Sequence, residues 1–326
     1  MKNFHLTFVI FLLIFSSSCC HKKNLNRDLD NLSTWNEGPA KKEITAFVER
    51  ITDSLNSDYV RPSDRIAVFD NDGTLICEKP YWFQMYFMLD RVKKLVKNHP
   101  EWKTKQPWKA ILENDTAYLA NLSNRDNDEI SISTQAGLTQ EELTRLYSDY
   151  YRIGRHPRFH ALFTSLTYPP MLQLMHFLET KGFRNYIVTG GGIEFIRSFS
   201  EKVYGIPPEQ VIGTHFQYSF TDSVSPSAVR LSPANYTVVV KEEKPDNIAL
   251  VIGKRPVIAV GNSNGDLQMF EYTDDRKGPS LQILIHHDDA TREYRYDDGA
   301  MQAFQAAAKR KWTVVSMKKD FKVIFH

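Results

Sequence analysis

The segment Ile66–Leu75 constrains the fold of this chain more than any other. Four apolar residues, Ile66 to Phe69, run directly into Asp70, Asn71, Asp72, Gly73 and Thr74. A short continuous apolar run that ends in turn residues is typical of a buried strand in a parallel sheet. Such sheets bind ligands beyond the carboxyl ends of their strands, and Gly73 permits the turn required there. The segment therefore predicts two carboxylates that converge at the mouth of a sheet.

Two later apolar runs end in the same way. Asn185–Val188 leads into Thr189-Gly190-Gly191-Gly192, and Val257–Val260 leads into Gly261-Asn262-Ser263-Asn264-Gly265-Asp266. A helical pattern follows each of them, and a further helix is expected to begin near Lys244. A threonine and glycines between a strand and a helix offer a hydroxyl and backbone amides to an anion. We expect all these strand ends to meet at one edge of the sheet.

The remaining pattern predicts an α/β fold with a helical insertion. The core is expected over 40–76 and 168–326, and helical patterns at 81–97, 107–119 and 139–153 predict a helical domain over 77–167. Thr139 and Glu142 form a capping box for the last of these helices. Apolar residues at helical spacing predict an amphipathic helix through Leu55. Residues 211–240 alternate in polarity, which predicts antiparallel strands beside the main sheet.

The N-terminus has the features of an export signal. Lys2 precedes the apolar run Leu6–Phe15, which is too short to span a membrane and is followed by small residues. Residues 1–20 are therefore predicted to be a signal peptide and residues 21–39 a tether. Cysteine after small residues resembles a bacterial lipoprotein signal, with Cys19 the favoured lipidation site and Cys20 the alternative. The chain is expected to be a periplasmic or cell-envelope lipoprotein of a bacterium, or otherwise secreted.

Charge and cysteine content limit the partners of the mature chain. The formal net charge is +2, which gives no basis for nucleic-acid binding or for attraction to an anionic membrane. Membrane contact is therefore expected only through the possible N-terminal lipid. Cys77 is the one cysteine after the signal, so no disulfide framework is expected despite export.

The strand-end motifs, taken in order, resemble those of the haloacid dehalogenase-like superfamily. Asp-x-Asp-Gly-Thr resembles the first motif of this superfamily, and Thr189 resembles the second. The third motif is a lysine that precedes the third strand, and Lys244 fits it better than Lys241. The string from Gly261 to Asp266 resembles the fourth motif, Gly-Asp-x-x-x-Asp, except that Asn262 replaces its first aspartate. The resemblance implies a three-layer, Rossmann-like core with a parallel sheet, and a helical cap as in phosphoserine phosphatase-like members.

The resemblance also implies a chemistry, which is hydrolysis of a small phosphorylated substrate with Mg²⁺. Asp70 would be the nucleophile and Asp72 the general acid and base. The other implied roles are phosphate binding by Thr189, Gly190 and Lys244, substrate-amine binding by Glu78, and metal binding by Asp70, Asp72, Asn262 and Asp266. Asn262 brings an amide oxygen but no charge, so weaker metal binding is expected.

Two other functions and one further site stay open. The loss of charge at Asn262 would suit a surface lipoprotein that binds ligands and no longer catalyses, and a phosphomutase would use the same residues. The strand Leu281–Ile285 ends in His286-His287-Asp288-Asp289, whose composition suggests a metal site. The favoured interpretation is that these four residues line the cleft edge or cap the following turn.

Overall fold

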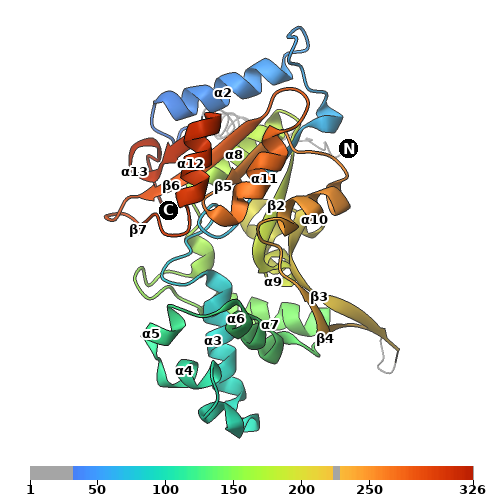
Figure 1. Ribbon diagram of the computed structural model, residues 1–326, viewed down its shortest axis with the longest axis vertical. Helices are drawn as coiled ribbons and strands as arrows, with labels where there is room; N and C mark the ends of the chain where they lie inside the picture. The colour runs from blue at the N-terminus through green and yellow to red at the C-terminus, as the bar shows by residue number, and fades with distance from the viewer. Residues whose placement is uncertain (1–31, 223–227, 326) are drawn as a thin grey trace, which may run out of the picture.

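The computed structural model describes residues 32–222 and 228–325, and these residues contain a sheet of eight strands (Figure 1). Its order is β4-β3-β2-β1-β5-β6-β7, and β8 pairs with β6. The central strand β1 (Ile66–Phe69) is flanked in parallel by β2 and β5. The other strand bounds are Arg184–Gly192 for β2, Val211–Thr221 for β3, Ala228–Thr237 for β4, Ile258–Gly261 for β5, Leu281–Asp288 for β6, Arg295–Tyr296 for β7 and Thr313–Ser316 for β8.

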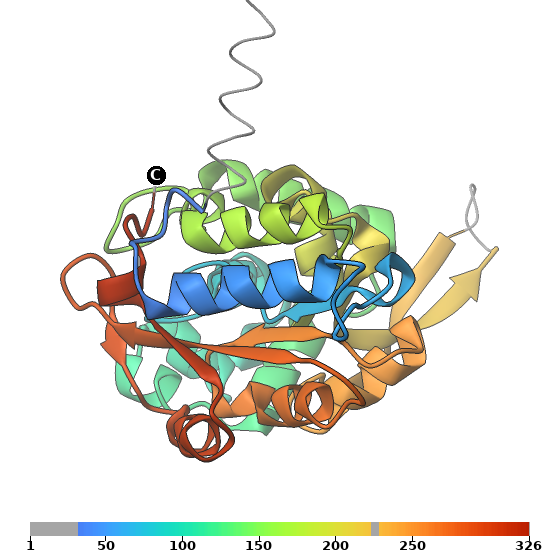
Figure 2. The same ribbon diagram turned by 90° about the horizontal axis from the view of Figure 1, so that it is seen from above.

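Helices cover both faces of this sheet and complete three layers (Figure 2). The upper layer contains α2 (Pro39–Thr52), α8 (Pro169–Thr180) and α9 (Ile193–Tyr204). The lower layer contains α10 (Glu243–Ile252), α11 (Leu267–Asp274) and α12 (Met301–Arg310). Side chains of β1 alternate between the layers, because Ala67 and Phe69 enter one buried cluster and Ile66 and Val68 the other. The predicted three-layer α/β core is confirmed.

Five helices form a separate layer beyond the carboxyl end of β1, below the core in Figure 1. The chain enters and leaves this layer side by side, since Ile76 bridges Thr167 and the Cys77 amide donates to the Leu166 carbonyl at 3.0 Å. Because these two connecting segments pair with each other, the helices lie over the ends of the strands. They are α3 (Phe83–Leu95), α4 (Trp108–Glu113), α5 (Thr116–Leu119), α6 (Asn124–Gln135) and α7 (Gln140–Ile153).

The structure corrects several boundaries. The segment predicted over 107–119 divides into α4 and α5 at Asn114, and α6 was not predicted, because its face carries polar residues. Leu55 lies beyond the end of α2 and is 93% exposed. The strand β3 is not an insertion beside the sheet, since its first residues pair in parallel with β2.

The predicted tether is also too long. Leu32 and Trp35 are buried, and the Trp35 indole donates to the Pro170 carbonyl at 2.8 Å. The described chain therefore packs on the core seven residues before α2 begins. The predicted leader, with Cys19 and Cys20, lies outside the described residues. Within residues 32–222 and 228–325, no helix has the length and apolarity needed to cross a membrane.

Candidate active site

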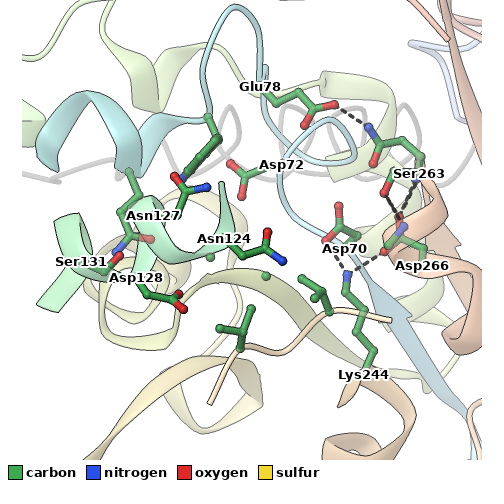
Figure 3. A pocket seen from close by; sticks show the side chains of 18 of the residues that line it. Asp70, Asp72, Glu78, Asn124, Asn127, Asp128, Ser131, Lys244, Ser263 and Asp266 are labelled. Carbon is green, nitrogen blue, oxygen red and sulfur yellow. Dashed lines mark hydrogen bonds and ion pairs between the residues drawn. The ribbon is translucent and has the colours of Figure 1, made fainter. Parts of the chain in front are cut away.

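Three charged side chains meet beneath the carboxyl end of β1 (Figure 3). Lys244, at the start of α10, donates from Nζ to Asp70 Oδ1 at 2.7 Å and to Asp266 Oδ1 at 2.6 Å. It also donates to the Val188 carbonyl at 2.8 Å, so all three ammonium protons have acceptors. Lys244 is only 2% exposed, and this burial by itself lowers its pKa. The carboxylates of Asp266 and Asp70 outweigh the burial and raise the pKa above its ordinary value, so Lys244 stays charged. Lys244, which the sequence favours over Lys241, therefore lies against Asp70.

Asp70 itself has one oxygen fixed and the other available. Oδ1 accepts from Lys244 at 2.7 Å, whereas the one side-chain donor to Oδ2 among the described residues is the Thr74 hydroxyl, at 3.5 Å. Burial and then the Asp266 carboxylate raise the pKa of Asp70, while Lys244 opposes that rise. Asp70 therefore depends on nearby cations to stay ionised.

Asp72 lies on the far side of the turn from Lys244 and faces the same cavity (Figure 3). Gly73 makes this turn possible with a positive φ of 75°, and its amide donates to the Ile76 carbonyl at 2.8 Å. Burial, followed by the Glu78 carboxylate, raises the pKa of Asp72 to about 7. A carboxyl group with a pKa near neutrality is suited to give and take protons.

The glycine segment after Thr189 approaches these carboxylates through an irregularity in the sheet. The pairing of β2 with β3 shifts register between Thr189 and Gly192, so Gly190 and Gly191 bulge from the ladder and line the cavity. A Cβ atom on Gly191 would lie 3.4 Å from Asp72 Oδ2. Thr189 itself is fully buried, and its hydroxyl accepts from the Gly191 amide at 2.9 Å. The backbone of this segment, rather than the Thr189 side chain, therefore faces the cavity.

Asp266 holds protein groups with both of its carboxylate oxygens. Oδ1 accepts from Lys244, and Oδ2 accepts from the amides of Asn262 and Ser263 at 3.1 and 3.0 Å. Asp266 therefore fixes Lys244 and the loop that carries Asn262. It was predicted among the metal residues, and in this structure its contacts are those of a positioning residue.

Asn262 faces Glu78 across the cavity mouth. The Asn262 amide donates from Nδ2 to Glu78 Oε1 at 2.8 Å (Figure 3). The Glu78 carboxylate thus places a negative charge next to Asn262, where an aspartate at position 262 would itself have been charged. A Cβ atom on Gly73 would lie 2.0 Å from Asn262 Nδ2, so only glycine permits this close approach.

The oxygens at this point fit Mg²⁺. Asp70 Oδ2 and Asn262 Oδ1 both lie 3.5 Å from the Thr74 hydroxyl, so a carboxylate and an amide oxygen border one small volume. Hard oxygen donors of this kind suit Mg²⁺, and a divalent cation would oppose the excess of carboxylates. The described residues contain no group of three or more His, Cys, Asp or Glu that could hold a metal ion.

The cavity above these groups has a volume of about 480 Å³. Its core wall contains the charged cluster and the glycine segment, and its cap wall comes from α3, α6 and the segment that includes Tyr236. Gln84 on α3 joins the two walls, because its Oε1 accepts from the Gly192 amide at 2.7 Å. Neither Gln84 nor the wall formed by α6 was predicted from the sequence. The polar residues of this helix recur at helical spacing, and that pattern could have predicted it.

The four residues after Ile285 have separate partners rather than a common metal. His287 is buried and bonds the Gly73 carbonyl at 2.7 Å through Nε2, while Nδ1 faces Glu293 at 3.3 Å. His286 pairs with Asp297, and the other two carboxylates accept from backbone amides: Asp288 from Lys318, and Asp289 from Thr291 and Arg292.

Glu293 was not predicted and completes a buried support for the Asp70–Glu78 loop. Its Oε1 accepts from the Cys77 thiol and the Tyr168 hydroxyl, each at 3.2 Å. His287 and Glu293 thus hold this loop from more than 200 residues away in the chain. His287 belongs to the string that the sequence places at the cleft edge, whereas nothing in the sequence indicated Glu293.

Comparisons with known proteins agree with this architecture. A model of the family described as haloacid dehalogenase-like hydrolase matches residues 67–271, which is more than half of the chain. A conserved functionally unknown protein from Anaerococcus prevotii has a similar structure, with 16% identity over 85% of this chain and 91% of that chain and a TM-score of 0.56.

Other solved structures are more distant. A phosphoserine phosphohydrolase-like protein from Francisella tularensis has 18% identity over 73% of this chain and 92% of that chain, with a TM-score of 0.42. A protein of unknown function from Bordetella pertussis has 14% identity over 77% and 98%, with a TM-score of 0.48. No curated protein matches the chain. The family match over the strand that carries Asp70, the glycine segment and the Asn262 loop shows that this chain belongs to the haloacid dehalogenase-like hydrolase family.

Proposed function

We propose that this chain is a phosphatase that hydrolyses a small phosphomonoester through an aspartyl-phosphate on Asp70, with Mg²⁺ as cofactor. One observation carries the proposal. Asp70 presents an oxygen to the cavity while Lys244 fixes its other oxygen at 2.7 Å, and Asp72 faces the same cavity with a pKa of about 7. A fixed carboxylate nucleophile beside a separate proton donor is the arrangement that two-step phosphoryl transfer requires.

Asp70 and Asp72 have different roles in the two steps of the reaction. The Asp70 carboxylate attacks phosphorus, the bond to the leaving oxygen breaks, and Asp72 gives its proton to that oxygen as the alcohol departs. Asp72, now ionised, takes a proton from water as the water oxygen attacks the phosphoenzyme. Inorganic phosphate leaves, Asp70 is regenerated and Asp72 is protonated again. The positive charge of the Lys244 ammonium and the amide of Gly190 stabilise the phosphoryl oxygens during both steps.

Asp70, the backbone carbonyl of Asp72 and Asn262 would hold Mg²⁺. When bound, this ion would offset the charge of the phosphate, which the carboxylates of the site otherwise repel. A panel of phosphomonoesters tests the function directly. We expect the purified chain to release inorganic phosphate with Mg²⁺ present, to lose this activity with a chelator, and to regain it when Mg²⁺ is restored. No release from any phosphomonoester would favour the alternative of a binding protein.

The Asn262–Glu78 pair allows a sharper test of the metal residues. Changing Asn262→Asp alone would set two carboxylates against each other, so the comparison is made in the Glu78→Gln background. There we expect Asn262→Asp to lower the Mg²⁺ concentration needed for half-maximal activity, because the site gains one negative ligand. The same substitution should increase the rise in melting temperature that Mg²⁺ produces without substrate. Unchanged Mg²⁺ titrations in both assays would contradict ligation by Asn262.

We also propose that the chain is exported and anchored by a lipid on Cys19. The support is the sequence alone: Lys2, the apolar run Leu6–Phe15 and the cysteine that follows small residues. Mass spectrometry of the mature N-terminus from a bacterial host is expected to show a lipidated cysteine as the first residue. A free amino terminus beyond Cys20 would contradict the anchor and leave simple secretion.

A further inference from the structure

One face of α6 forms the cap wall opposite Asp70 and Lys244 (Figure 3). Asn124, Asn127, Asp128 and Ser131 are spaced by three, four and seven residues from the first, which places them on a single face of a helix. All four line the cavity. A leaving group bound with its phosphate at Asp70 would extend toward this face.

Two of these side chains have polar groups that the protein leaves without partners. Asn127 Oδ1 is buried and accepts no hydrogen bond from any described residue. This oxygen has almost no exposed surface, so it lies inside the cap wall and is not open to a ligand in the cavity. Burial raises the pKa of Asp128, which also lines the cavity. A donor that carries positive charge would therefore stabilise the ionised carboxylate of Asp128.

The charges of the residues that line the cavity also favour a positively charged ligand at the α6 face. Lys244 is the only cation among the described residues that line the cavity, and it is held at the phosphate end by Asp70 and Asp266. The cap wall therefore offers no cation to a second anionic group on the substrate. The rings of Trp82 and Tyr236 line the cavity as well, and aromatic faces attract cations.

We propose that the α6 face binds an ammonium group on the leaving alcohol, with the Asp128 carboxylate as its acceptor. The substrate class is then the phosphomonoester of an amino alcohol that carries no carboxylate. This inference rests on the proposed phosphatase function and adds the identity of the leaving group. A primary ammonium fits better than a quaternary one, because only the former donates a hydrogen bond to the Asp128 carboxylate.

Three substrates of similar size test the inference. Phosphoethanolamine carries the ammonium group, 2-hydroxyethyl phosphate replaces it with a hydroxyl, and phosphoserine adds a carboxylate beside it. We expect kcat/KM for phosphoethanolamine to exceed that for 2-hydroxyethyl phosphate by about tenfold or more, because hydrogen bonds to charged groups are stronger than neutral ones. Phosphoserine should also be poorer than phosphoethanolamine, since its carboxylate would face Asp128.

Two variants of Asp128 show whether the preference comes from α6. Asp128→Asn should reduce the ratio of kcat/KM between the ammonium and hydroxyl substrates by about tenfold. Asp128→Lys should shift preference toward phosphoserine over phosphoethanolamine, a gain that a misfolded chain could not give. The matched control is Glu129→Gln, which removes the same charge from the next residue of α6. Glu129 does not line the cavity and pairs with Arg125 at 2.9 Å, so the ratio should not change.

The outcomes separate this inference from the function on which it rests. A wild-type chain that hydrolyses all three substrates with equal kcat/KM overturns the ammonium site and leaves the phosphatase function standing. A preference for phosphoethanolamine that persists in Asp128→Asn overturns the role of α6. A chain that hydrolyses no phosphomonoester overturns the proposed function and this inference together.

Discussion

Replacing Asp70→Asn is expected to lower phosphatase turnover by at least about a thousandfold while the chain stays folded. The amide is a far poorer nucleophile than the carboxylate, and one metal charge is lost with it. The fold should persist, because the amide oxygen can still accept from Lys244 and because Asp266 keeps its own 2.6 Å contact with that ammonium. Release of inorganic phosphate from an aryl phosphate measures the loss, and thermal unfolding measures the fold.

The matched control for this variant is Asp297→Asn. Asp297 is paired with His286 at 2.8 Å and does not line the cavity, so its charge can be removed without a change at the site. Activity should stay near that of the wild type. Residual turnover of Asp70→Asn within tenfold of the wild type would exclude Asp70 as the nucleophile, provided that the melting temperatures agree.

A second readout follows from the covalent step. Brief incubation of the wild-type chain with substrate and denaturation in acid should trap phosphate on the protein, whereas Asp70→Asn should trap none. Phosphate trapped on the Asp70→Asn chain would place the nucleophile elsewhere. This readout does not depend on the rate of turnover, so it distinguishes a lost nucleophile from a slowed one.

The sequence allowed the centre of the site to be predicted because each part of it is local. An apolar strand and the residues that follow it are contiguous, so Asp70, Asp72, Gly190 and Asn262 could be assigned to strand ends by pattern alone. Parallel pairing of β2, β1 and β5 then brings these ends together. Lys244 was harder to choose, but its place at the start of a helix favoured it over Lys241.

The parts that escaped prediction depend on contacts between distant segments or on polar helix faces. The role of Asp266 became clear only from its bonds to Lys244 and to two amides of its own loop. Glu293 supports the loop after Asp70 from the other end of the chain. The α6 helix has little apolar periodicity because one of its faces lines a cavity, and so the pattern that predicts packed helices did not find it.

Replacing Asp72→Asn is expected to affect substrates according to how much their leaving groups need a proton. An alkyl phosphate releases a strongly basic alkoxide, so loss of the general acid should slow its hydrolysis by about 10²–10⁴-fold. A nitrophenyl phosphate releases a weakly basic phenolate, and its first step should be much less affected. The raised pKa of Asp72, near 7 through burial and Glu78, means that the wild-type carboxyl is partly protonated at neutral pH and can act as this acid.

The second step separates the base role of Asp72 from its acid role. Water attack on the phosphoenzyme also needs Asp72, so the Asp72→Asn variant should accumulate phosphoenzyme with the aryl substrate. Rapid-mixing measurements are then expected to show a burst of nitrophenolate close to one equivalent per chain, followed by a slow phase. The wild-type chain serves as the control, with a smaller burst because its second step is faster. If the variant instead hydrolysed aryl and alkyl phosphates with equal losses of rate and showed no burst, Asp72 would be neither the general acid nor the general base. Its role would then be to orient the turn between β1 and the cavity.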